Sequence, residues 1–248
     1  MLQKTVGIVL RTQDYGETHK LVTIFTKEVG KITTISRGAN KPRSRLSAVS
    51  QLFIEADFLL YIPKGLATLR QGDIISTYRH IREDLLRTTY AAYMIELTDK
   101  LIEEKSPDPF LYNELSQTLE WINEEEDYLV PLMMYEMKLF KKGGFAPVVD
   151  YCVNCSYHEG LQAFSIREGG ALCNRCVSID QYAMRLPPAL FRILSIFLHV
   201  ELDRVGKIKM KTENIERLRQ LLDQYYDQYG GYKIRSRKLL EQFKKLEE

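Results

Sequence analysis

Apolar and polar residues alternate with a period of two through the first 80 or so residues. Short segments rich in β-branched residues, TVGIVLRT, KLVTIFT and KITTISR, are separated by the turn-like DYGE and KEVG. Every second residue from Leu52 to Ile62 is apolar, which predicts one buried strand face, and a fifth strand is expected within ATLRQGDIISTY. Five short strands in about 80 residues fit an OB-fold barrel, although an SH3-like barrel would give nearly the same pattern.

After Tyr78 the apolar period changes from two to about 3.6, which predicts helices. We expect them over residues 84–104, 110–122, 128–140 and 187–200, then from Thr212 as N-cap to 226, and over 236–248. The third should end where Gly143 or Gly144 takes the left-handed C-cap. The fold class is therefore α+β, with a five-stranded OB-fold barrel at 1–80 and a mainly helical domain at 81–248.

The four cysteines of the chain form two pairs, CVNC and CNRC, at Cys152, Cys155, Cys173 and Cys176. Each two-residue turn aims two thiolates at one point, so two such turns complete a tetrahedron around one structural zinc ion. Four sulfur ligands leave no open position for a catalytic water. Two disulfides are the alternative to a metal site. His158 is a candidate to replace one of the four thiolates, but we interpret it as a surface histidine. We expect this zinc module to occupy about 146–182.

Charge is segregated along a chain whose net formal charge is only +2. Residues 1–80 hold 12 Lys or Arg against 6 Asp or Glu, whereas residues 81–150 hold 7 against 15. The segment RGANKPRSR, residues 37–45, places Arg37, Lys41, Arg43 and Arg45 in the connection after the third strand, without an acid. Such a patch attracts polyanions, and we interpret it as a flexible phosphate clamp in place of an ordinary solvated loop.

Enzyme signatures are missing from the chain, which favours a binding protein without nucleotide hydrolysis. We find no phosphate-loop, H-E-x-x-H, G-x-S-x-G or K-x-D-G motif. The acids in NEEEDY, residues 123–128, are interpreted as a solvated turn. No secretory leader or membrane span is expected, so a cytoplasmic protein is the prediction.

The run YGETHKLVTIFTKEVGKITTISRGANKPRSRL, from Tyr15 to Leu46, closely resembles the start of the RecO family of bacterial DNA repair and recombination mediators. KLFKKGGFAPVVDYCVNC, the second cysteine pair and IRSRKLL follow in family order. His19 stands where the family suggests a small polar or acidic residue. Cysteine pairs are not universal in the family, so the zinc prediction depends on the cysteines themselves.

The resemblance implies a protein that binds single- and double-stranded DNA and anneals strands coated with single-strand-binding protein. With the partner RecR it would promote loading of RecA, and it would be associated with the nucleoid during repair. The expected phosphate contacts are Arg37, Lys41, Arg43 and Arg45, with Lys31 and Arg70 as weaker candidates on the barrel. Tyr15 and Tyr61 are candidates for base stacking.

The acidic C-terminal tail of single-strand-binding protein is a further expected partner. Its groove should combine adaptable apolar side chains with cations. We predict it at Met134, Met137, Lys138, Lys141 and Lys142. Two alternatives for the whole chain stay open, an RNA-binding or transcription-associated protein and an enzyme of nucleic-acid metabolism.

Overall fold

The computed structural model describes residues 1–206 and 209–247, which form two compact units. One unit comprises Met1–Glu126 with Ile234–Glu248, and the other comprises Asp127–Lys233. Glu248, the end of the last predicted helix, lies outside the described residues. The first unit joins the barrel to helices that the sequence assigns to the domain beginning at residue 81, so the two divisions of the chain differ.

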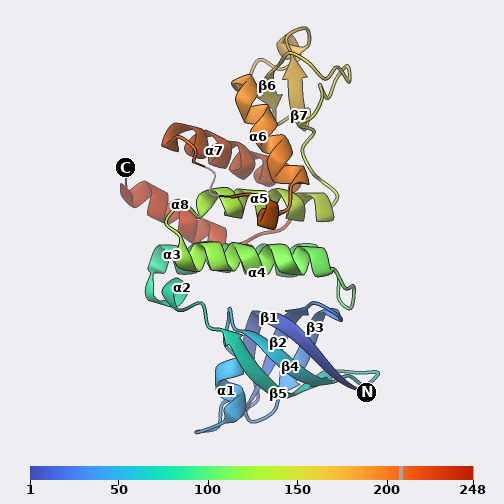
Figure 1. The fold of residues 1–248 in the computed structure, drawn as a ribbon, viewed down its shortest axis with the longest axis vertical. Helices are drawn as coiled ribbons and strands as arrows, with labels where there is room; N and C mark the ends of the chain where they lie inside the picture. Colours follow the sequence, from blue (N-terminus) through green and yellow to red (C-terminus); the bar gives the residue numbers. More distant parts are fainter. Residues whose placement is uncertain (207–208, 248) are drawn as a thin grey trace. The chain divides into compact units, whose positions relative to one another are not determined.

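The first unit is built on a closed five-stranded barrel (Figure 1). Its strands pair in the order β1-β2-β3-β5-β4, and all pairs are antiparallel except β3 with β5. This order is that of the OB-fold, so the prediction is confirmed. The strands are β1 (Leu2–Tyr15), β2 (His19–Thr26), β3 (Gly30–Ser36), β4 (Glu55–Tyr61) and β5 (Ala67–Ser76).

The barrel interior is filled by branched and aromatic side chains from every strand. The cluster comprises Val9, Val22, Ile24, Ile32, Val49, Ile54, Ala56, Phe58, Leu60, Ala67 and Leu69. The predicted alternation holds from Ile54 to Leu60. Leu52 is the exception, with 36% of its surface exposed, because β4 begins only at Glu55. The chain is still turning before that strand, and Phe53 has a φ of 66°.

Helices of the same unit pack on the barrel and on one another. Asp84 caps α3 by accepting from the Arg87 N–H, and Asp108 caps α4, whose first residue is Pro109. Two five-residue helices were not predicted, because five residues are too few to reveal a 3.6-residue period. The helices are α1 (Arg45–Val49), α2 (Arg79–Glu83), α3 (Leu85–Leu101), α4 (Pro109–Glu124) and α8 (Arg235–Glu247).

A buried carboxylate joins β4 to these helices. Glu55 is only 8% exposed and accepts hydrogen bonds from the hydroxyls of Tyr78 (2.5 Å), Tyr112 (2.7 Å) and Ser116 (3.1 Å). A buried charge is tolerated when several donors replace its water shell. Lys31 on β3 similarly pairs with Asp99 on α3 at 3.4 Å.

The second unit combines helices with a small sheet, ordered β7-β6-β8, that the sequence did not predict. Gly144 has a φ of 80° and so takes one of the two C-cap positions expected after α5. The helix α7 begins at Thr212 with Lys211 as N-cap, so the predicted cap is wrong by one residue. The elements are α5 (Leu129–Lys142), β6 (Leu161–Ser165), β7 (Gly170–Cys173), β8 (Met184–Arg185), α6 (Pro188–His199) and α7 (Thr212–Tyr229), with 3-10 turns at Val177–Ile179 and Leu202–Arg204.

The core of this second unit is aromatic and includes a buried ion pair. Phe140 on α5 stacks on Tyr225 and Tyr226 of α7, with ring centroids 6.1 and 5.8 Å apart. Glu136 of α5, fully buried, accepts from Arg219 of α7 at 2.8 Å. In the described part of the chain, no helix combines the length and apolar character needed to cross a membrane.

Candidate nucleic-acid interface and metal centre

The basic segment leaves the barrel at the end of β3 and leads into α1, which begins at Arg45. Arg37, Lys41, Arg43 and Arg45 are all exposed. Among the residues that the structure describes, none of these four cations has a carboxylate within ion-pairing distance. Their charge is therefore available to an external anion, and their mutual repulsion favours one.

Hydrogen bonds tie this segment to the turn between β1 and β2. The Asn40 N–H donates to the Thr18 carbonyl at 3.0 Å, and the Asn40 side-chain amide donates to Asp14 at 2.9 Å. The Gly38 N–H donates to Nδ1 of His19, also at 2.9 Å. The segment is thus a series of anchored turns, which differs from the flexible clamp that the sequence suggested.

Two residues of the segment have left-handed backbone conformations. Gly38 has a φ of 75°, which glycine adopts without strain, whereas Arg43 has a φ of 60°. For a residue with a Cβ this conformation costs about 1 kcal/mol or more. Strained backbone of this kind persists where the surrounding turns fix it, and it is frequent at binding sites.

Of the two weaker DNA-contact candidates, Arg70 lies beside the segment and Lys31 does not. Ser36 pairs with Leu69 in the parallel β3–β5 ladder. Arg37 and Arg70 are the next residues after this pair, one on each side of the ladder. Arg70 is exposed, whereas Lys31 is only 9% exposed and is neutralised by Asp99. We therefore keep Arg70 in the candidate interface and leave Lys31 out.

Both tyrosines that were considered for base stacking are at the surface. Tyr15, at the end of β1, is 49% exposed, and Tyr61, at the end of β4, is 40% exposed. The Arg70 guanidinium lies over the Tyr61 ring, 5.6 Å from its centroid. A ring with an adjacent guanidinium provides a stacking platform that does not depend on base identity.

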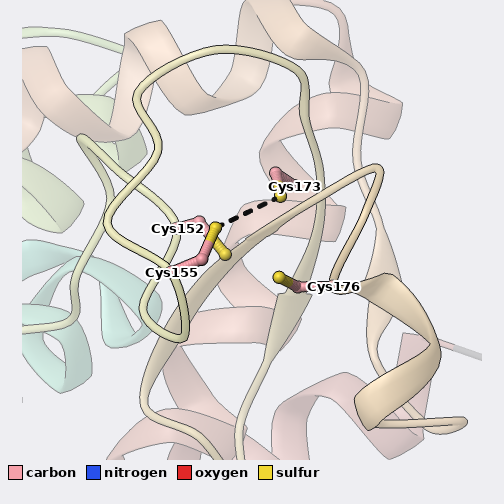
Figure 2. Close-up of side chains that lie close together, drawn as sticks. All are labelled: Cys152, Cys155, Cys173 and Cys176. Carbon is pink, nitrogen blue, oxygen red and sulfur yellow. Dashed lines mark hydrogen bonds between the residues drawn. The ribbon is translucent and has the colours of Figure 1, made fainter.

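The four cysteines converge on one point in the second unit, as Figure 2 shows. Their sulfur atoms all lie within 4.8 Å of one another. Each pair forms a tight turn, closed by a Ser156 N–H bond to the Cys152 carbonyl (2.8 Å) and a Cys176 N–H bond to the Cys173 carbonyl (3.0 Å). The sulfurs of Cys155 and Cys173 are 3.7 Å apart, a separation that fits two ligands on a tetrahedral metal ion and exceeds a disulfide bond length.

Local hydrogen bonds make the thiols unequal. Burial raises the pKa of Cys152, but backbone N–H groups of Cys173, Cys155 and Asn154 outweigh it and lower that pKa to about 6. The Asn154 amide lowers the pKa of Cys176, but burial and the neighbouring sulfurs outweigh that bond and raise it to about 12. Four adjacent thiols thus do not all ionise unless a cation takes the place of their protons, and the donor set suits a soft metal ion.

The other candidate ligands lie outside this cluster. His158 is exposed and its ring faces Tyr151, with centroids 5.5 Å apart. Of the acids at 124–127, Glu124 is the last residue of α4, and Glu126 pairs with Arg87 at 2.9 Å; Glu124, Glu126 and Asp127 are exposed. In the described residues the four cysteines are the one group with metal-binding geometry.

The residues predicted to bind a partner peptide are not together at the surface. Met134 and Met137 are fully buried in α5, and Lys138 is 4% exposed, whereas Lys141 and Lys142 are exposed. The methionine spacing that suggested an adaptable groove is that of a core-facing helix side. We therefore do not place a peptide site on this helix.

The chain is therefore a protein of the class that combines an OB-fold barrel with a helical part and a four-cysteine cluster of the kind that binds a metal ion. Family models described as the N terminal and the C terminal of Recombination protein O match residues 1–78 and 82–238. The chain is 52% identical over 242 residues to the DNA repair protein RecO of Oceanobacillus iheyensis, covering 98% of this chain and 94% of the relative. It is 46% identical to that of Bacillus pumilus, with 99% and 96% covered. It is 44% identical to that of Bacillus cereus strain AH187, with both chains covered in full. The chain belongs to the RecO family.

Proposed function

We propose that this protein is a DNA repair and recombination mediator that binds DNA through the barrel and anneals strands coated with single-strand-binding protein. Membership of the RecO family supports the repair role. The further steps, cooperation with RecR and loading of RecA, come from the family resemblance. The proposed role is binding and positioning, without catalysis.

The observation that carries DNA binding is the unpaired charge of the basic segment. Four exposed cations, which have no carboxylate partner among the residues that the structure describes, lie on a loop fixed at the end of the barrel, next to Arg70. Contacts of these groups with phosphates provide affinity but no base preference. Tyr61, with Arg70 above its ring, would accept a base by stacking.

For the second unit we propose one structural zinc ion per chain, held by Cys152, Cys155, Cys173 and Cys176. Convergence of four sulfurs supports a metal, and an all-sulfur set favours zinc among the common ions. The ion would tie β7 to the chain before β6. With four protein ligands it would have no position for a reacting water.

A salt titration of single-strand binding tests the proposed DNA interface. Four phosphate contacts predict that log affinity falls with log salt at a slope of roughly −3, from about −0.7 per contact. Replacing the four loop cations by Ala should flatten this slope and weaken binding equally for unrelated sequences. A matched variant removes four exposed cations of the second unit instead, Arg192, Lys209, Lys211 and Lys233.

Two outcomes would redirect the assignment. Equal slopes for the wild type and the loop variant would make the segment an ordinary solvated surface. Tighter binding of RNA than of DNA with the same sequence would favour the RNA-binding alternative. Annealing of strands coated with single-strand-binding protein, measured without nucleotide, tests the mediator activity itself.

A further inference from the structure

We infer that His19, in its neutral form, is the positioning residue of the basic segment. The inference rests on the proposed function, because the segment is the proposed DNA contact. Nδ1 of His19 accepts the Gly38 N–H at 2.9 Å and lies 3.3 Å from the Thr18 hydroxyl. Gly38 follows Arg37 directly, so this bond sets the path by which the cationic loop leaves β3.

The geometry defines the protonation state of the imidazole. A backbone N–H can only donate, so Nδ1 must carry a lone pair and Nε2 must carry the proton. Protonation at Nδ1 would place two N–H donors against each other. The bond to Gly38 would then be lost, and the first turn of the loop would lose its anchor.

Other contacts hold the remainder of the loop, which separates the His19 effect from general unfolding. Asn40 is bonded to Thr18 and to Asp14, and Asp14 also pairs with Lys20 at 2.9 Å. These bonds do not require a neutral imidazole. Loss of the His19 bond should therefore release the residues around Gly38 while leaving Asn40 attached.

Several charged and titratable groups surround the imidazole. Tyr15 is its partner across the β1–β2 ladder, and Glu17 lies in the intervening turn. Arg37 flanks Gly38, and the Lys41 side chain passes within 3.6 Å of the position that a Gly38 Cβ would occupy. These are the charged and titratable groups that a proton on the ring would face.

The chain offers a matched pair of substitutions. In His19→Asn the amide oxygen takes the place of Nδ1, so the acceptor is retained but cannot be protonated. In His19→Ala the acceptor is removed. The pair therefore separates the hydrogen bond from the titration.

The direct test follows the Gly38 amide by NMR in the free protein between pH 8 and pH 5. In the wild type, the Gly38 amide shift and its hydrogen-exchange protection should change with the same midpoint as the His19 imidazole nitrogens. At pH 8 those nitrogens should show a proton on Nε2 alone. In His19→Asn the Gly38 amide should stay protected and independent of pH. If the shift and the protection of the wild-type Gly38 amide do not change as His19 titrates, the inference is wrong, whatever the protein binds.

Single-strand binding at pH 8 then measures the consequence for the interface. His19→Ala should weaken affinity by about 2- to 10-fold, the equivalent of one neutral hydrogen bond, with the salt slope unchanged because all four cations remain. His19→Asn should restore affinity to within 2-fold. Equal affinities for His19→Ala and the wild type would refute the positioning role. The salt slope of the variant in which the four loop cations are replaced by Ala is a separate measurement, and it tests the proposed function alone.

Discussion

The barrel and the cysteine module differ in the residues that form their centres. The barrel has a continuous apolar interior, to which every strand contributes, and a buried carboxylate satisfied by three hydroxyls. The module has strands of two to five residues, and four sulfur atoms occupy its centre. Apolar burial stabilises the barrel at any metal concentration, whereas we expect the fold of the module to depend on a metal ion bound by the four thiols.

The two regions also differ in how they place charge for function. On the barrel strands, Lys4, Lys20 and Lys31 pair with acids. Within the described part of the chain, Arg70 and the four cations of the segment after β3 have no carboxylate partner. In the module, the neighbouring Asn154 amide donates to Cys176 at 3.4 Å and orients a ligand. The proposed DNA binding therefore depends on the geometry of a loop, whereas the proposed metal binding depends on four thiols that already lie together.

The largest expected effect is the loss of the module on Cys173→Ser. Structural zinc contributes apparent free energies of about 10–16 kcal/mol in small zinc-binding peptides, so a lost ligand should abolish both metal binding and local order. We expect less than one tenth of the wild-type metal per chain by elemental analysis. Amide exchange should rise across β6 and β7 but not across β4.

The matched control is His158→Ala, which removes an exposed histidine three residues after Cys155 and should leave metal content unchanged. Addition of a strong chelator to the wild type should reproduce the exchange pattern of Cys173→Ser. If exchange in β4 rises as much as exchange in β7, the barrel and the module do not differ in their dependence on metal.

An intermediate effect is expected for Tyr112→Phe in the barrel unit. It removes one of three donors to the buried Glu55 carboxylate and should lower the free energy of unfolding by about 1.5–3 kcal/mol, the usual value for a hydrogen bond to a charged group. Urea unfolding followed by circular dichroism measures the change. The same loss should appear with the metal removed by chelator.

Alkaline pH provides a second measurement on the same hydroxyls. Burial, and secondly the Glu55 charge, raise the pKa of Tyr112 and of Tyr78 well above the ordinary value. Above about pH 10 the unfolded chain releases these protons and the folded chain retains them, so stability present below pH 10 is lost as pH rises. Each tyrosine should contribute about 1.4 kcal/mol per pH unit. Tyr112→Phe should reduce this slope, and the exposed Tyr15→Phe should not.

Sequence patterns identified the features that depend on local spacing. Alternation over Ile54 to Leu60 is a local property of one strand, and the two cysteine pairs have the spacing of a metal site, so the sequence predicts both. Spacing alone does not tell whether an apolar stripe faces a core or a groove. The sequence therefore predicts a groove at Met134 and Met137, whereas both side chains are fully buried in the core.

Local sequence patterns do not predict contacts between residues that are far apart in the sequence. The pairing of Lys31 with Asp99 joins positions 68 residues apart. The three donors to Glu55 come from two places, Tyr78 before α2 and the pair Tyr112 and Ser116 on α4. The bond from Gly38 to His19 depends on how the turn after β3 folds back on the β1–β2 turn. A neutral histidine acceptor has no sequence signature, because its role is defined by the backbone donor that faces it.

The smallest expected effect concerns the left-handed backbone at Arg43, and it separates loop strain from loop charge. Arg43→Ala and Arg43→Gly remove the same cation, but only glycine adopts a φ of 60° without a steric penalty. The glycine variant should therefore be more stable than the alanine variant by about 1 kcal/mol, reduced by the greater freedom of glycine in the unfolded chain. Both should reduce the salt slope of single-strand binding by about 0.7, since each loses one phosphate contact. Urea unfolding and the salt titration are measured on the same two proteins. Equal stabilities would mean that the turn relaxes when the side chain is lost, whereas unequal slopes would mean that backbone conformation at this position, and not charge alone, determines the contact with phosphate.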